Sequence, residues 1–301
     1  MRDPRMSALG KGLRRRGRLM VQAVSPPRRV SPERRTLNAV PSPREAVDTD
    51  TDTAGTVPLA PRLVESPVFV LSSVRSGSTL LRVLLNSHSR IRAPHEMHLR
   101  TVHVQFSRDF TADAMKELRL DRQELEHVLW DRILDLELTH SGKDVIVDKT
   151  PANTLIFKRL RRCWPNARYI VLLRHPGAVV SSLVNRRDNP NLEAIHEEVL
   201  QYAEKLEEAR QQLEGAHVIT YEDLTADPER ITRGLCAYLG VPWESAMLDY
   251  GSHDHGRFRP KLGDWSSTIK SGRIQAARTA DPEIELPPRL AELAKAWGYT
   301  G

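Results

Sequence analysis

The chain has 301 residues, of which 40% are hydrophobic and 28% charged, and its formal net charge at pH 7 is +6. No apolar run reaches the roughly 20 residues that a membrane-spanning helix needs, so no membrane span is expected. Residues 1–65 hold 13 Lys and Arg against 7 Asp and Glu, whereas residues 66–301 hold 32 of each kind. The excess positive charge therefore lies in the N-terminal segment, and the balanced remainder argues against a nucleic-acid partner.

Residues 1–65 are rich in Arg, Pro, Ser and Thr and show no sustained hydrophobic period. This composition predicts a disordered, basic and dispensable extension, followed by one domain over residues 66–301. The run KGLRRR at 11–16 fits either binding to acidic surfaces or a transit signal. Because no apolar stretch follows it, a secretory signal is not expected. A start codon assigned too early would give the same pattern.

The two cysteines, Cys163 and Cys236, have neither metal-ligand spacing nor the number that a disulfide framework needs. We expect both to be buried thiols in a reducing compartment, which predicts a cytoplasmic protein.

An apolar run at 68–71 predicts a buried strand, and leucines at helical spacing from Leu80 to Leu85 predict a helix after it. A turn between the two leaves backbone N–H groups unpaired at the positive end of a helix, where anions bind. Gly77 allows a ligand to approach the backbone closely, and Arg75 offers a planar fork of donors. Hydroxyl donors come from Ser76, Ser78 and Thr79. The segment thus predicts a phosphate or sulfate cradle, the alternative being a helix merely capped by Ser78.

The cradle does not match the loop that binds nucleoside triphosphates in kinases. Leu71 or Ser72 stands near the first glycine position of that loop, and Gly77 is followed by Ser78 instead of Lys. The run RSGSTLL at 75–81 instead resembles the 5′-phosphosulfate loop of sulfotransferases that use 3′-phosphoadenosine 5′-phosphosulfate (PAPS). The resemblance is strongest to the bacterial and Golgi tyrosylprotein types, in which Arg often replaces the Lys of cytosolic enzymes.

Three titratable residues, His95, Glu96 and His98, follow a short strand-like segment. Any of them could take a proton from an acceptor hydroxyl, although a plain polar turn would look the same. The resemblance implies that Glu96 is the base, because tyrosylprotein-type enzymes carry a Glu at this distance from the Arg-Ser-Gly motif. His98 stands where that group carries Arg, so its role stays open.

A second apolar strand is predicted at 144–148, and Lys149 follows it. On its own, a Lys at a strand end most often reaches solvent. The family resemblance implies that Lys149 contacts the sulfuryl group during transfer, because Lys-Thr-Pro follows the second strand in many sulfotransferases.

A third strand, turn and helix are predicted from residue 168 onward. Arg174 at the end of the strand (168–173) and Ser182 on the helix could face one anion if the turn folds back. In sulfotransferases this Arg and Ser bind the 3′-phosphate of the nucleotide. Because both nucleotide motifs occur in order, the chain is identified as resembling PAPS-dependent sulfotransferases.

The rest of the chain predicts a strand at 216–220 and helices within 112–140, 153–163, 192–213, 229–239 and 287–298. The apolar stripe of 192–213 could join two subunits as a homodimer, but packing on its own sheet is the commoner use. The run YEDL, which begins at Tyr221, is typical of the family, and Tyr221 is assigned to the nucleotide by that resemblance. Residues 251–275 are expected to form a loop that closes over the ligand. The run GDWSSTIKSGR at 263–273 resembles the C-terminal nucleotide-contact segment of bacterial sulfotransferases, which implies Lys270 and Arg273 as candidate phosphate contacts.

Together these patterns predict an α/β domain with a central, mainly parallel sheet, helices on both faces and a P-loop-NTPase-like sulfotransferase fold. The site should lie at the carboxyl ends of the strands. The resemblance implies sulfuryl transfer from PAPS to a hydroxyl of an acceptor, expected to be a small molecule or metabolite, without a metal. The alternatives are a nucleotide-dependent kinase and a non-catalytic nucleotide-binding protein.

Overall fold

The computed structural model describes residues 61–258 and 267–299, so the expected disorder of residues 1–60 lies outside the described residues. The described chain is already anchored before residue 66. Arg62 forms an ion pair with Glu124 at 3.1 Å, and the backbone N–H groups of Leu63 and Val64 donate to the carboxylate of Asp131. The structured part therefore includes a few residues that the sequence assigned to the extension.

One sheet forms the centre of the structure, and all of its strand pairs are parallel, as predicted. The strand order is β2-β3-β1-β4-β5. Four strands coincide with predicted ones, and β2 is a two-residue strand in the segment that looked only strand-like. The strands are β1 (Val68–Ser72), β2 (Ile91–Arg92), β3 (Val145–Asp148), β4 (Arg168–Leu173) and β5 (His217–Thr220).

The longer helices follow the predicted periodic segments, whereas α7 (Tyr221–Ala226), which lies where a turn was expected, and α9 (Ser267–Lys270), which lies in the expected loop, were not predicted. The segment expected as one helix over 153–163 begins instead at Pro151 as a 3-10 helix, η2 (Pro151–Ile156), and becomes an α-helix only at Phe157. The α-helices are α1 (Ser78–Asn86), α2 (Asp109–Glu117), α3 (Arg122–Ser141), α4 (Phe157–Cys163), α5 (Pro176–Val184), α6 (Leu192–Gln212), α7 (Tyr221–Ala226), α8 (Pro228–Leu239), α9 (Ser267–Lys270) and α10 (Pro288–Ala296).

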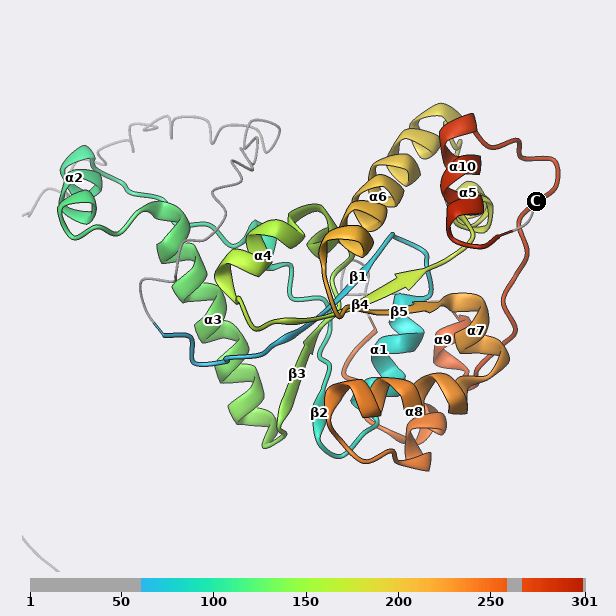
Figure 1. The fold of residues 1–301 in the computed structure, drawn as a ribbon, viewed down its shortest axis with the longest axis horizontal. Helices are drawn as coiled ribbons and strands as arrows, with labels where there is room; N and C mark the ends of the chain where they lie inside the picture. The colour runs from blue at the N-terminus through green and yellow to red at the C-terminus, as the bar shows by residue number, and fades with distance from the viewer. Residues whose placement is uncertain (1–60, 259–266, 300–301) are drawn as a thin grey trace, which may run out of the picture. The chain divides into compact units, whose positions relative to one another are not determined.

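Side chains that alternate along β1 enter two different cores, because successive residues of a strand face opposite sides of the sheet. Val68 and Val70 pack in the core that α1 and α8 share, whereas Phe69 and Leu71 pack with α3, α4 and α6. Figure 1 shows these two groups of helices on the two sides of the strands. Helices on both faces are thus confirmed.

The apolar stripe of α6 is used inside the chain. Residues such as Ile195 and Val199 pack against α5 and α10, and Leu206 and Ala209 pack under the sheet. Packing on its own domain, the commoner use of such a stripe, is what the structure shows. In the part of the chain that the structure describes, no helix is both long and apolar enough to cross a membrane.

Candidate functional site

A cleft of about 560 Å³ lies where four parallel strands end. Arg75 follows β1, Pro151 follows β3, Arg174 follows β4 and Tyr221 follows β5, and all four residues line it. This is the edge of the sheet at which an open α/β fold gathers ligand contacts. The location of the site at the carboxyl ends of the strands therefore agrees with the sequence pattern.

The loop between β1 and α1 forms one wall of the cleft. Gly77 caps α1 with a left-handed backbone (φ 83°), and the ring of Tyr221 packs directly on it. A Cβ atom at position 77 would lie 2.1 Å from the Tyr221 ring, so only glycine fits here. Ser78 and Thr79 line the cleft from the first turn of α1. The side chain of Ser76 does not, because it is buried and its hydroxyl donates to the carbonyl of Ser73 at 2.8 Å.

The cleft is built to hold negative charge. The side chains lining it within the described residues include five arginines and a single carboxylate, that of Glu96. Two of the arginines were predicted as anion contacts, Arg75 and Arg174, and a third, Arg273, was a candidate. A cleft with this charge balance favours an anionic ligand with several phosphate or sulfate oxygens.

Arg75, Arg174 and Ser182 come together although they lie far apart in the sequence. One Arg174 amino group donates to the carbonyl of Arg75 at 2.7 Å, and Arg75 Nε donates to the Ser182 hydroxyl at 3.3 Å. The Arg174 guanidinium lies 4.6 Å from the centre of the Tyr221 ring. Burial lowers the pKa of Arg174, and the neighbouring Tyr221 opposes that shift. Within the described residues, its Nε atom is buried and has no hydrogen-bond partner.

Glu96, which lines the cleft, forms an ion pair with Lys149, which is buried and does not itself line the cleft. Lys149 Nζ lies 2.5 Å from Glu96 Oε1 and 3.4 Å from the Thr79 hydroxyl. The Lys149 side chain is only 1% exposed, so it does not reach solvent as an ordinary lysine at a strand end would. Burial lowers the pKa of Lys149, and the carboxylate of Glu96 opposes that shift.

The two histidines near Glu96 differ in their surroundings. His98 Nε2 lies 3.6 Å from Glu96 Oε2, whereas His95 is exposed and its Nδ1 faces the backbone carbonyl of Glu96 at 3.0 Å. Of the three titratable residues singled out in the sequence, only Glu96 lines the cleft, with His98 beside it.

The C-terminal segment contributes to the cleft differently from what its sequence suggests. Lys270 is exposed and does not line it, because α9 turns Ile269 inward and leaves the next residue outside. Arg273 and Arg278 line it instead. Sequence reasoning missed Arg278, which lies in an irregular stretch, and Arg186, which lies in the turn just after α5 ends.

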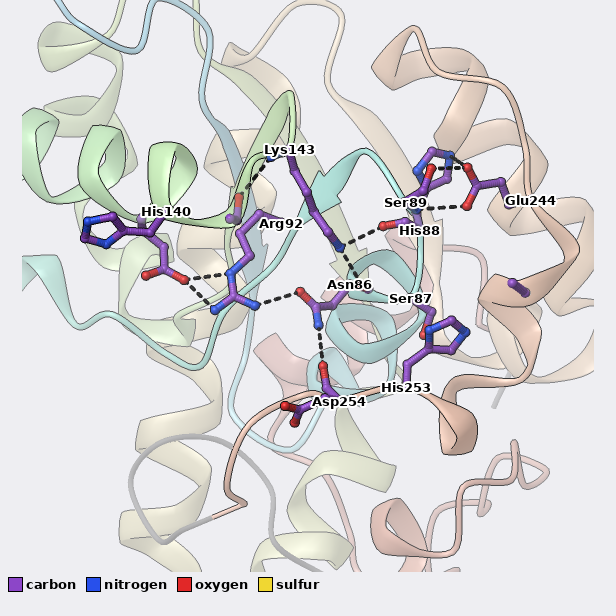
Figure 2. A pocket seen from close by; sticks show the side chains of 13 residues that line it. Asn86, Ser87, His88, Ser89, Arg92, His140, Lys143, Glu244, His253 and Asp254 are labelled. Atoms are coloured by element: carbon purple, nitrogen blue, oxygen red, sulfur yellow. Dashed lines mark hydrogen bonds and ion pairs between the residues drawn. The ribbon is translucent and has the colours of Figure 1, made fainter.

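A second hollow, of about 700 Å³, lies at the opposite end of α1, and its polar groups are largely engaged with one another (Figure 2). Lys143 Nζ donates to the carbonyls of Asn86, His88 and Ile91 at 2.8–3.0 Å. Glu244 accepts from the hydroxyl and the backbone N–H of Ser89. The Lys143 bonds join the last carbonyl of α1 to two carbonyls of the segment that follows it, so the polar groups of the larger hollow act as a structural brace.

The comparisons with known proteins agree with the geometry. A family model described as the sulfotransferase family matches residues 67–245. Protein-tyrosine sulfotransferase 1 of Danio rerio is 26% identical over 210 residues, which cover 61% of this chain and 55% of that protein. The nodulation protein NoeE of Sinorhizobium fredii is 35% identical over 126 residues, which cover 38% of this chain and 30% of that protein. The chain thus spans about half or less of the length of these relatives.

Two solved structures share most of the fold. The sulfotransferase domain from the curacin biosynthetic pathway matches with a TM-score of 0.61 and 25% identity, over 79% of this chain and 99% of that domain. The sulfotransferase domain from the Synechococcus PCC 7002 olefin synthase matches with a TM-score of 0.59, also at 25% identity, over 79% of this chain and 97% of that domain. Since the family model covers more than half of the chain and the parallel sheet carries an arginine-lined cleft at the expected edge, the chain belongs to the sulfotransferase family.

Proposed function

We propose that this protein is a cytoplasmic enzyme that transfers the sulfuryl group of PAPS to a hydroxyl of a small-molecule acceptor. One observation carries the proposal: a carboxylate and a buried ammonium, those of Glu96 and Lys149, meet at 2.5 Å beside the cradle at the start of α1. A protein that only binds nucleotide needs no such pair. A kinase needs a Lys after the loop glycine and a magnesium ligand at a strand end, where this chain has Ser78 and Arg174.

The residues present fit the donor. The N-terminus of α1, with Ser78 and Thr79, offers backbone N–H groups and hydroxyls to the 5′-phosphosulfate. Arg174 has a buried Nε without a partner in the described residues, and it lines the cleft together with Ser182, which is the pair that we assign to the 3′-phosphate. The Tyr221 ring, held between Gly77 and Arg174, closes that end of the cleft.

The chemistry assigned to the residues is an in-line displacement at sulfur. Glu96 takes the proton of the acceptor hydroxyl as the acceptor oxygen forms its bond to sulfur. The bond between sulfur and the bridging oxygen breaks, and adenosine 3′,5′-bisphosphate leaves. Lys149 and Arg75 stabilise the negative charge that grows on the bridging and sulfuryl oxygens, and the burial of Lys149 strengthens its interaction with that charge.

The donor is tested by titrating the protein with PAPS, adenosine 3′,5′-bisphosphate and ATP, with and without Mg²⁺. We expect tight, metal-independent binding of the first two and weak binding of ATP. Preference for ATP with Mg²⁺ would favour the kinase.

Transfer is tested with radiolabelled PAPS and a panel of phenols, alcohols, sugars and tyrosine-containing peptides. The peptides are included because several relatives are named protein-tyrosine sulfotransferases. Glu96→Gln keeps the shape of the side chain but cannot accept a proton, so transfer should fall by about 10²–10⁴-fold. Affinity for adenosine 3′,5′-bisphosphate should hardly change. Wild-type turnover in Glu96→Gln together with an inactive His98→Ala would assign the base to the imidazole.

A further inference from the structure

We propose that Thr150 is a positioning residue: its hydroxyl, held by the buried carboxylate of Asp148, fixes the backbone at 97–98 so that Glu96 meets Lys149. The inference rests on the proposed function, because it concerns the geometry of the proposed base. Thr150 follows Lys149 directly, so one strand end carries both the cation and the group that places its partner.

The contacts around Thr150 use the full bonding capacity of its hydroxyl. The hydroxyl donates to Asp148 Oδ1 at 2.8 Å and accepts from the backbone N–H groups of Met97 at 3.1 Å and His98 at 3.4 Å. Asn153 Nδ2 donates to the other oxygen of Asp148, also at 2.8 Å. Asp148, Thr150 and Asn153 are each at most 1% exposed. A hydroxyl has one hydrogen and two lone pairs, so its orientation here is fixed by three partners.

The segment held by Thr150 needs an external anchor. His98 has a left-handed backbone (φ 51°), which residues with a side chain rarely adopt. Such a conformation persists only where the surroundings enforce it, and strained residues of this kind gather at functional sites. The bonds from Met97 and His98 to Thr150 supply that constraint directly next to Glu96.

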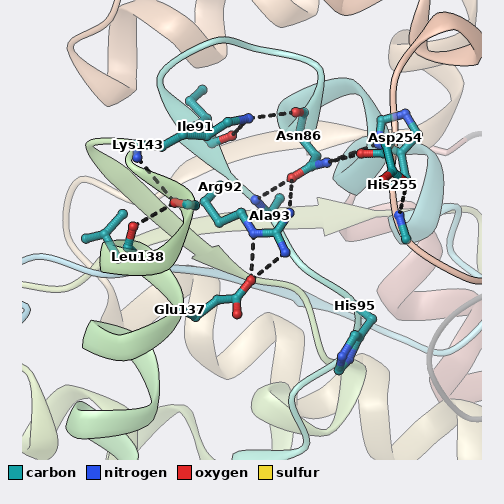
Figure 3. A network of polar contacts seen from close by, with 12 residues as sticks. Asn86, Ile91, Arg92, Ala93, His95, Glu137, Leu138, Lys143, Asp254 and His255 are labelled. Carbon is teal, nitrogen blue, oxygen red and sulfur yellow. Dashed lines mark hydrogen bonds and ion pairs between the residues drawn. The ribbon is translucent and has the colours of Figure 1, made fainter.

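A second anchor lies on the other side of Glu96, at Ala93. The N–H of Ala93 donates to Asn86 Oδ1 at 3.0 Å, which Figure 3 shows, and its carbonyl accepts from Arg82 at 3.2 Å. Both partners belong to α1, the helix that starts at the cradle. Glu96 is therefore suspended between one anchor on α1 and one at the end of β3. Removing the Thr150 anchor should free residues 97–98, on the C-terminal side of Glu96, and leave the Ala93 anchor on its N-terminal side in place.

The experiment compares Thr150→Val with Thr150→Ser in the full chain. Valine keeps the volume but removes the hydroxyl that accepts from the Met97 and His98 N–H groups and donates to Asp148, whereas serine keeps the hydroxyl. We expect kcat for transfer from radiolabelled PAPS to fall by about ten-fold or more in Thr150→Val, since small misplacements of reacting groups carry such costs. The KM for PAPS and the affinity for adenosine 3′,5′-bisphosphate should stay within about two-fold of the wild-type values. Thr150→Ser should restore most of kcat.

A control variant separates positioning from stability. Thr232 is equally buried, and its hydroxyl accepts from Trp243 Nε1 at 2.9 Å, far along the chain in α8. Thr232→Val should lose stability without losing kcat. In a Glu96→Gln background, Thr150→Val should have no further effect on transfer, because it acts through the missing carboxylate.

Each outcome decides between the two claims. A wild-type chain that transfers sulfate to no acceptor in the panel overturns the proposed function and this inference together. Transfer by the wild type with an unchanged kcat in Thr150→Val overturns the positioning role alone. A parallel loss of nucleotide affinity, or a further loss of rate in the Glu96→Gln background, does the same. If Thr150→Val does not fold, Thr150→Cys gives the same comparison, because a thiol is a weak acceptor.

Discussion

Alanine at position 77 should disable the nucleotide end of the cleft while leaving the fold intact. In Gly77→Ala the new Cβ atom would lie 2.1 Å from Tyr221 Cδ2 and 2.2 Å from Cε2. Carbon atoms in contact are about 3.5–4.0 Å apart, so the ring must retreat by more than about 1 Å. The left-handed backbone of residue 77 adds about 1–2 kcal/mol of strain for any residue with a Cβ.

The retreat of Tyr221 carries over to Arg174, whose guanidinium lies 4.6 Å from the ring centre. We expect the affinity for adenosine 3′,5′-bisphosphate, measured by calorimetry, to fall at least about ten-fold, or about 1.4 kcal/mol. The free energy of unfolding in urea should fall by about 2–5 kcal/mol, because the backbone strain and the usual cost of overpacking, about 1–3 kcal/mol, add together.

A matched control is available at Gly142, at the end of α3, which also has a left-handed backbone (φ 63°) but where an added Cβ atom would meet nothing within 4 Å. Gly142→Ala should therefore lose stability from strain and keep its nucleotide affinity. Adding Tyr221→Ala to Gly77→Ala should recover stability lost to the clash. Wild-type affinity in Gly77→Ala, or an equal loss of affinity in Gly142→Ala, would refute the reasoning.

Charges and contacts elsewhere in the chain lead to three further expectations. Arg174→Ala and Ser182→Ala should each weaken the binding of adenosine 3′,5′-bisphosphate, measured by calorimetry, by about 1.5–3 kcal/mol, and that of adenosine 5′-phosphate far less. Equal losses for both ligands would contradict the assignment of these residues to the 3′-phosphate. Burial lowers the pKa of His127 from 6.5 to about 3, so between these pH values the unfolded chain binds a proton that the folded chain does not. The free energy of unfolding should therefore fall by up to about 1.4 kcal/mol for each pH unit below 6.5. Urea unfolding should show a shallower pH slope in His127→Gln, and an unchanged slope would contradict this. A chain that starts at Pro61 should fold and bind nucleotide like the full chain. A chain that starts at residue 66 should unfold at a lower urea concentration, because Asp131 loses the N–H donors of Leu63 and Val64. Equal unfolding midpoints for the two chains would contradict this.

The parts of the fold that could be predicted are those that depend only on residues close together in the sequence. The apolar runs at β1, β3 and β4 indicated strands, because a strand buried on both faces is apolar at nearly every position. The edge strand β5 buries only Ile219. Gly77 and Arg75 marked the cradle because few other residues suit a close backbone approach and an anion. The convergence of Arg174 and Ser182 followed from a strand, a turn and a helix of ordinary length.

The parts that could not be predicted depend on where segments meet in space. Nothing in the sequence near Thr150 indicates that its hydroxyl reaches the backbone at 97–98, because this contact requires β3 and the segment after β2 to lie side by side. Lys270 and Arg273 looked equivalent as phosphate contacts in the sequence. The short helix α9 determines that Arg273 lines the cleft and Lys270 does not. The hydroxyl of Ser76 bonds to the carbonyl of Ser73 in its own loop and does not face the cleft, and the sequence alone does not indicate which of the two it would do.

The three carbonyls around Lys143 also make its amine a natural reporter of local opening. An amine reacts with acylating reagents only when it is deprotonated and free, and here the ammonium is held by carbonyls of Asn86, His88 and Ile91. Burial lowers the pKa of Lys143, which by itself would speed labelling, so slow labelling would reflect its three hydrogen bonds. The rate at which a reagent labels this lysine, measured by mass spectrometry, would report how often the C-terminal end of α1 opens, on a helix whose first turn lines the arginine-rich cleft.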